Sequence, residues 1–150
     1  MPNRPTPPAR PTPALLCIVA LSLLTALPPA TARADDALGG MDVVSLRDAG
    51  RVAQGGEDIT THWRGHEWHF ANEANRATFE ADPRAYAPGF GGDCPVALAQ
   101  GERRPGQPGL FVVVGNTLYL ASTPQARTAL ESDPAPVISA AKAQWKRLAR

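Results

Sequence analysis

Apolar and polar residues alternate through residues 66–70, which is the pattern of a β-strand with one buried face. The alternation divides the side chains between two faces, with His66, Trp68 and Phe70 on one and Glu67 and His69 on the other. Gly65 can adopt the positive φ of a tight turn, so residues 58–70 predict a β-hairpin. A second hairpin is predicted over residues 110–120, where apolar runs flank the turn pair Gly115-Asn116.

Capping residues and apolar periodicity predict four short helices. Asn72 is placed to cap a helix that runs to about Ala81. Pro95 fits the first position of a helix that ends before Gly101, with Cys94 as the residue that enters it. Two further helices are predicted to begin at the Thr-Pro and Asp-Pro pairs, and the second of them carries an apolar stripe of Ile138, Ala141, Trp145 and Leu148.

The remaining segments carry weaker patterns. Residues 43–46 form a short apolar stretch in a glycine-punctuated region and predict an irregular strand, and residues 84–92 predict a loop. The combined pattern predicts an α+β fold, a small single domain with two β-hairpins and three or four short helices. The sequence shows no internal repeat and no second domain.

The first 34 residues have the composition of an export signal. Two arginines precede an apolar run at residues 14–27, two prolines break the run, and Ala32-Arg33-Ala34 is typical of a cleavage site. We therefore expect a signal peptide at residues 1–34, a domain at residues 35–150 and a periplasmic or secreted protein. The run is shorter than the roughly 20 residues of a membrane span, so no stable span is expected after cleavage, although an uncleaved anchor is the alternative.

Charge and cysteine content narrow the choice of partners. Of the 15 Lys and Arg residues, three lie in the signal, and all 14 Asp and Glu residues lie beyond it. The mature domain is therefore slightly acidic, which argues against nucleic-acid binding. Its single cysteine, Cys94, cannot form an internal disulfide, although an intermolecular one is an alternative for an exported protein. A monomer or weak dimer is expected, and the sequence identifies no protein partner.

An ordered series of motifs runs through nearly the whole mature chain. Its segments are residues 39–44, 63–76, 79–88, 91–95 and 100–101, followed by Leu118-Tyr119-Leu120 and Trp145. The series resembles the YHS domain family, in particular the exported single-domain bacterial YHS proteins. The chain departs from the family pattern at several positions, which are Met41, Val43, Asp93, Pro95, Phe111 and Ala121-Ser122. The resemblance implies a metal-handling role, because relatives in metal pumps carry cysteines associated with metal binding, and these extra cysteines are missing here.

Three residues are candidate metal ligands: Cys94, His66 and His69. Thiolate and imidazole are the ligands that copper and zinc prefer, so a copper or zinc ion is the expected cofactor class. The two histidines are three positions apart on a predicted strand and therefore point to opposite faces, so that convergence on one ion would require a bulge. The alternative for Cys94 is a small buried side chain at a helix entry.

These observations predict a non-enzymatic periplasmic domain that binds a metal ion or a small ligand near Cys94. The alternative is a structural or protein-interaction module in which the cysteine is buried and inert. Thiol catalysis is disfavoured, because Asp93 opposes a thiolate at the neighbouring position and no spacing places a histidine base beside Cys94.

Overall fold

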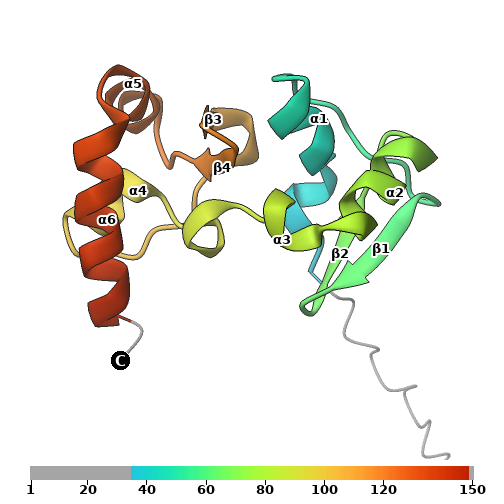
Figure 1. Cartoon of the computed structure of the whole chain (residues 1–150), viewed down its shortest axis with the longest axis horizontal. Helices are drawn as coiled ribbons and strands as arrows, with labels where there is room; N and C mark the ends of the chain where they lie inside the picture. The colour runs from blue at the N-terminus through green and yellow to red at the C-terminus, as the bar shows by residue number, and fades with distance from the viewer. Residues whose placement is uncertain (1–34, 149–150) are drawn as a thin grey trace, which may run out of the picture. The chain divides into compact units, whose positions relative to one another are not determined.

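The computed structural model describes residues 35–148, and the predicted signal peptide lies outside the described residues. Within them the fold is α+β, a small single domain with two antiparallel two-stranded sheets (Figure 1). The helices are α1 (Val43–Asp48), α2 (Glu73–Ala81), α3 (Pro83–Tyr86), α4 (Pro95–Ala99), α5 (Pro124–Ser132) and α6 (Pro134–Leu148). The strands are β1 (Thr60–Trp63), β2 (His66–His69), β3 (Phe111–Val114) and β4 (Thr117–Leu120), and 3-10 turns lie at η1 (Ala37–Gly40), η2 (Gly89–Gly92) and η3 (Pro108–Leu110). No helix in residues 35–148 combines the length and apolarity that a membrane crossing requires.

Both predicted hairpins are present. Strand β1 pairs with β2 so that Thr60 faces His69, and β3 pairs with β4 so that Phe111 faces Leu120. The capping predictions are also confirmed: the side chain of Asn72 accepts a hydrogen bond from the Asn75 N–H at the start of α2. Local turn and capping chemistry therefore determines most element boundaries.

Two segments differ from the prediction, and together they raise the number of helices to six. Residues 43–46 belong to helix α1 rather than to a strand, because the buried Asp42 carboxylate accepts hydrogen bonds from the N–H groups of Val44 and Ser45. The predicted loop at residues 84–92 contains α3 and η2, and the side chain of Asp82 caps α3 in the same way. In both cases an aspartate cap outweighs a weak apolar pattern.

The order of elements occurs twice. The series η1, α1, β1, β2, α2 and α3 is followed by η2, α4, β3, β4, α5 and α6, with η3 added before β3. We call residues 35–86 the first repeat and residues 87–148 the second repeat. Corresponding residues lie 51 positions apart in the hairpins (Thr60 and Phe111) and 52 apart in the preceding turns (Ala37 and Gly89).

The backbone hydrogen bonds that close each repeat also correspond. The hydrogen bond from Asp42 N to Ala53 O (2.9 Å) corresponds to that from Cys94 N to Arg104 O (2.8 Å). The bond from Gly55 N to Gly40 O (2.9 Å) corresponds to that from Gly106 N to Gly92 O (2.8 Å). The bond from Phe70 N to Ile59 O (2.9 Å) corresponds to that from Ala121 N to Leu110 O (3.0 Å). Leu38 and Phe90 correspond as well and share a positive φ, 55° and 57°. The expectation of no internal repeat is therefore wrong. Identical residues recur at this offset, among them Asp82-Pro83 with Asp133-Pro134, but they are too widely spaced to stand out in the sequence.

One core serves both repeats. Its aromatic members belong to the first repeat, and Trp68, Phe70, Phe79 and Tyr86 are all buried, as the sequence predicts for the aromatic residues. Leu118 and Leu120 of β4 belong to the same cluster, so the second repeat supplies part of the core of the first. Two smaller clusters lie within the second repeat, one around Cys94 and one around Leu130.

Candidate functional site

The three predicted ligands do not form one group. Cys94 is fully buried among small residues of the second repeat, whereas His66 is exposed on β2. Among the His, Cys, Asp and Glu side chains of residues 35–148, one group of three can offer ligand atoms that all lie within 4.8 Å of one another. Its members are Asp36, Glu67 and His69. The structure therefore places His69 in a candidate site without Cys94 or His66.

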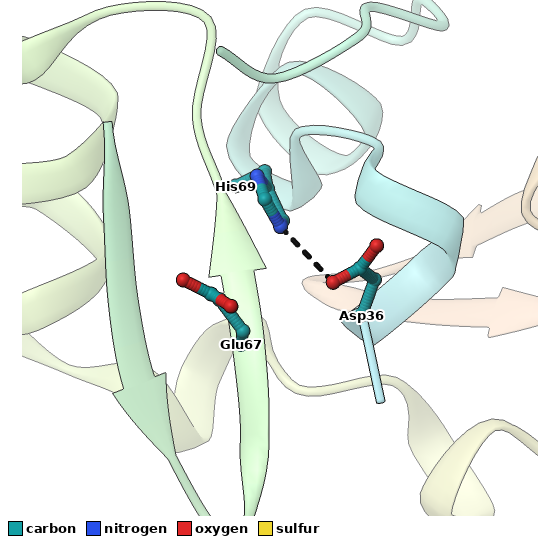
Figure 2. A group of neighbouring side chains, drawn as sticks. All are labelled: Asp36, Glu67 and His69. Atoms are coloured by element: carbon teal, nitrogen blue, oxygen red, sulfur yellow. Dashed lines mark hydrogen bonds and ion pairs between the residues drawn. The ribbon is translucent and has the colours of Figure 1, made fainter. Parts of the chain in front are cut away.

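Two elements bring this group together. Glu67 and His69 are two residues apart on β2 and share a face of the hairpin, as the alternation predicts. Asp36 arrives from the segment that enters the domain: it forms a parallel bridge with Glu67, and the Glu67 N–H donates to the Asp35 carbonyl at 3.3 Å. Figure 2 shows the Asp36 carboxylate facing the His69 ring.

Both ring nitrogens of His69 lie near oxygen acceptors. Nδ1 lies 3.1 Å from the Gly56 carbonyl oxygen, and Nε2 lies 3.3 Å from Oδ1 of Asp36. A neutral imidazole has one N–H, so it can donate to only one of these two oxygens at a time. When Nδ1 donates to Gly56, the Nε2 lone pair points toward the Asp36 carboxylate and is available to a cation.

The group can hold a metal ion after a closing movement. In a tetrahedral zinc site the ligand atoms lie about 3.4 Å from one another, because each bond is about 2.1 Å long. The widest separation here, at most 4.8 Å, must therefore shrink by about 1.4 Å or less. The Asp36 side chain is 57% exposed and can make that movement, whereas His69, at 13%, is held by its neighbours. The Gly56 carbonyl supplies the outer hydrogen bond that metal-ligating histidines commonly make.

The second repeat has no such group at the corresponding hairpin positions. Leu118 and Leu120 stand where Glu67 and His69 stand in the first repeat, and both leucines are buried. The hairpin backbone therefore does not require polar residues at these two positions. Glu67 and His69 are only partly buried, and this is the difference in environment that permits polar side chains in the first repeat.

Sequence reasoning missed Asp36 and Glu67. The shared face of Glu67 and His69 was visible in the alternation. Asp36 lies 31 positions before Glu67 in the chain, and no sequence pattern links the two. Only the bridge between the entering segment and β2 places the aspartate there.

Cys94 occupies the position in the second repeat that Asp42 occupies in the first. It stands at the N-cap of α4, where no side-chain oxygen caps the helix. Burial raises the pKa of the Cys94 thiol. The Ser122 hydroxyl and the N–H groups of Ala97, Ser122 and Val96 interact with the sulfur and outweigh burial, so the pKa is lowered from its usual value. These groups favour a thiolate, but no metal ligand of another type joins Cys94 in a group.

Comparisons with protein-family models, with curated proteins and with solved structures gave no match to this chain.

Proposed function

We propose that this protein is an exported, non-enzymatic YHS-like domain that binds a divalent metal ion of the zinc or copper class through His69, Asp36 and Glu67. The convergence of one imidazole nitrogen with two carboxylates carries the proposal, since ligand atoms of His69, Asp36 and Glu67 all lie within 4.8 Å of one another. One imidazole with two carboxylates suits Zn(II) or Cu(II) better than Cu(I), which prefers sulfur ligands. Three protein ligands leave at least one coordination position to water, which suits reversible binding.

The proposed site does not include Cys94, near which the sequence predicted binding. The thiol is fully buried, and the group that can converge on an ion includes His69 but neither Cys94 nor His66. The YHS resemblance and the export signal support an extracytoplasmic metal-handling role, and the contacts of His69 support its location.

Calorimetric titration with Zn(II) and Cu(II) tests the proposal. We expect one ion per chain, and we expect His69→Gln to weaken binding by at least about 100-fold, because it removes the one nitrogen ligand. Glu67→Leu copies the residue at the corresponding position of the second repeat, so it should weaken binding while the hairpin stays folded. The matched controls are His66→Gln and Cys94→Ser, which should bind as the unchanged protein does.

Metal should also stabilise the fold. At a free ion concentration of 100 times the Kd, the free energy of unfolding should rise by about 2.7 kcal/mol. Binding that survives His69→Gln but disappears in Cys94→Ser would restore the thiol-centred site. Absence of binding in the unchanged protein would reject the metal function altogether.

The second candidate is a structural or protein-interaction module, which the complete burial of Cys94 favours. In that case Nε2 of His69 and Oδ1 of Asp36, which lie 3.3 Å apart, help to hold the entering segment on β2. His69→Gln would then leave metal affinity at the background level in both proteins and would lower thermal stability, which distinguishes the two candidates.

A further inference from the structure

A cleft of about 410 Å³ lies against the His66 and Trp68 face of β2, and Asp36 of the metal group also lines it. Its other walls include Leu38 of η1, Trp63 and Arg64 of the first hairpin, Pro88, and the acidic residue Asp35. The volume lies within the range of small-molecule sites, and a predominance of apolar and aromatic walls with a few polar groups is the usual character of such sites.

In the second repeat, the turn that corresponds to the one around Leu38 is covered by an aromatic side chain. There Phe90 corresponds to Leu38, and the ring of Trp145 in α6 packs on Phe90 edge-on with 6.0 Å between ring centroids. The same indole lies 3.8 Å from the position that a Cβ on Gly91 would take. The Arg103 guanidinium lies 5.1 Å from the centroid of that indole. A turn with a bulky residue at positive φ, followed by glycine, is thus covered by an aromatic ring.

The first repeat lacks this cover. Helix α6 runs from Pro134 to Leu148, but its counterpart α3 ends at Tyr86 after four residues, so no residue corresponds to Trp145. Gly39 corresponds to Gly91, and a Cβ added to Gly39 would meet no atom of residues 35–148 within 4 Å. Leu38 beside it forms part of the cleft wall. The place that an indole fills in the second repeat is therefore open in the first.

The rim of the cleft carries a cation that the hairpin turn does not need. Arg64 has a φ of 53°, and Gly115, at the same position of the second hairpin, has a φ of 61°. A residue with a side chain in this conformation costs about 1 kcal/mol relative to glycine. The Arg64 guanidinium lies over Trp63, 4.6 Å from the ring centroid, which gives the cleft a cation beside an aromatic wall.

We propose that this cleft binds the planar aromatic ring of a free small compound of about the size of an indole. The ring packs against Leu38 and Trp63 as Trp145 packs on Phe90, and the Arg64 guanidinium contributes a cation–π contact. The contacts that carry this proposal are those of Leu38, Trp63 and Arg64, none of which belongs to the metal group, although Asp36 of that group lies at the edge of the cleft.

Titration with indole, followed by NMR of the tryptophan side-chain N–H groups, tests the proposal. The chain contains three tryptophans, which differ in their distance from the cleft. We expect the largest saturable shifts for the Trp63 and Trp68 signals, which line the cleft, and a smaller shift for Trp145, which packs beside the cleft residue Gly91. Arg64→Gly should weaken indole binding by about 2- to 5-fold through loss of the cation–π contact, while its melting temperature stays equal or rises. The matched control is Arg127→Gln, an arginine of the second repeat that does not line the cleft.

Phenol and cyclohexanol, rings of equal size that differ in their π electrons, serve as the matched ligand pair, and cyclohexanol should bind at least several-fold more weakly than phenol. Three results would overturn the proposal. One is the absence of any shift at millimolar indole, another is a shift confined to Trp145, and the third is equal binding of phenol and cyclohexanol. Because metal is left out of the titration, failure here leaves the metal function unaffected, and failure of the metal titration leaves this result unaffected.

Discussion

A sulfur at position 94 occupies the place that a carboxylate occupies at position 42. The Asp42 side chain is fully buried and accepts hydrogen bonds from Val44 N, Ser45 N, Ser45 Oγ, Ala71 N and Asn75 Nδ2. The groups that act on the Cys94 sulfur include the N–H groups of Val96, Ala97 and Ser122, which correspond to three of those donors. An N-terminal helix cap needs an electron-rich acceptor, and a thiolate meets that need with longer and weaker bonds.

The lowered pKa of Cys94 predicts a pH-dependent stability. The folded state favours the thiolate, so between the lowered pKa and the unfolded value of about 9.0 the unfolded chain binds more protons than the folded one. The free energy of unfolding, relative to Cys94→Ser, should therefore rise as pH increases through this window and level off above it. Urea unfolding of both proteins at several pH values measures the difference, and thiolate absorbance locates the folded pKa. A difference that stays flat or falls with pH would contradict the assignment.

At the scale of the elements, each hairpin depends on a glycine whose φ is not positive, so another residue could adopt its backbone conformation. A Cβ on Gly106 would overlap the Cβ and carbonyl oxygen of Leu120, and a Cβ on Gly55 would overlap the Cβ and backbone of His69. These glycines let the segment before each hairpin pass directly against the last residue of the returning strand. Close approach, rather than turn geometry, is the physical requirement here.

We expect Gly106→Ala to lower the free energy of unfolding by about 2 kcal/mol or more, because backbone atoms must shift to admit the methyl group. Gly109→Ala is the matched control: an added Cβ there would meet nothing within 4 Å, so stability should be unchanged or raised by about 0.4–1 kcal/mol. Denaturant midpoints of the two variants measure the effects. Equal midpoints would show that the backbone at Gly106 can shift to admit a Cβ without a measurable loss of stability.

The sequence predicts those elements whose signals are local. The Asn72 cap, the Gly115-Asn116 turn and the prolines that begin α4, α5 and α6 each lie within a few residues of the element they determine. Helix α1 was missed because its apolar residues, Val43, Val44 and Leu46, suit a buried strand equally well. Only part of the candidate site could be predicted: the alternation places Glu67 and His69 on one face, but Asp36 joins them through a β-bridge between segments far apart in the sequence.

At the scale of the whole molecule the two repeats are interdependent. Leu120 is 3% exposed and packs with the aromatic cluster of the first repeat, although it belongs to the second. Removing its side chain should cost about 2–5 kcal/mol, the usual range for a buried leucine replaced by alanine. Neither repeat has a separate core large enough to be stable by itself.

Leu120→Ala should therefore lower the unfolding midpoint of both repeats together. The side-chain N–H signals of Trp63 and Trp68 report on the first repeat, and that of Trp145 reports on the second. In a urea series all three signals should disappear in a single transition, in the unchanged protein and in the variant. Separate transitions for Trp68 and Trp145 would show that the repeats fold independently.

The leucines shared between the repeats also constrain the order in which the core can close. Trp68, Phe70 and Phe79 precede Leu118 and Leu120 in the chain, although all five belong to one buried cluster. In a chain that emerges N-terminus first, this cluster lacks two of its members until the second hairpin has followed. The first repeat therefore cannot complete its packing before the second hairpin is present.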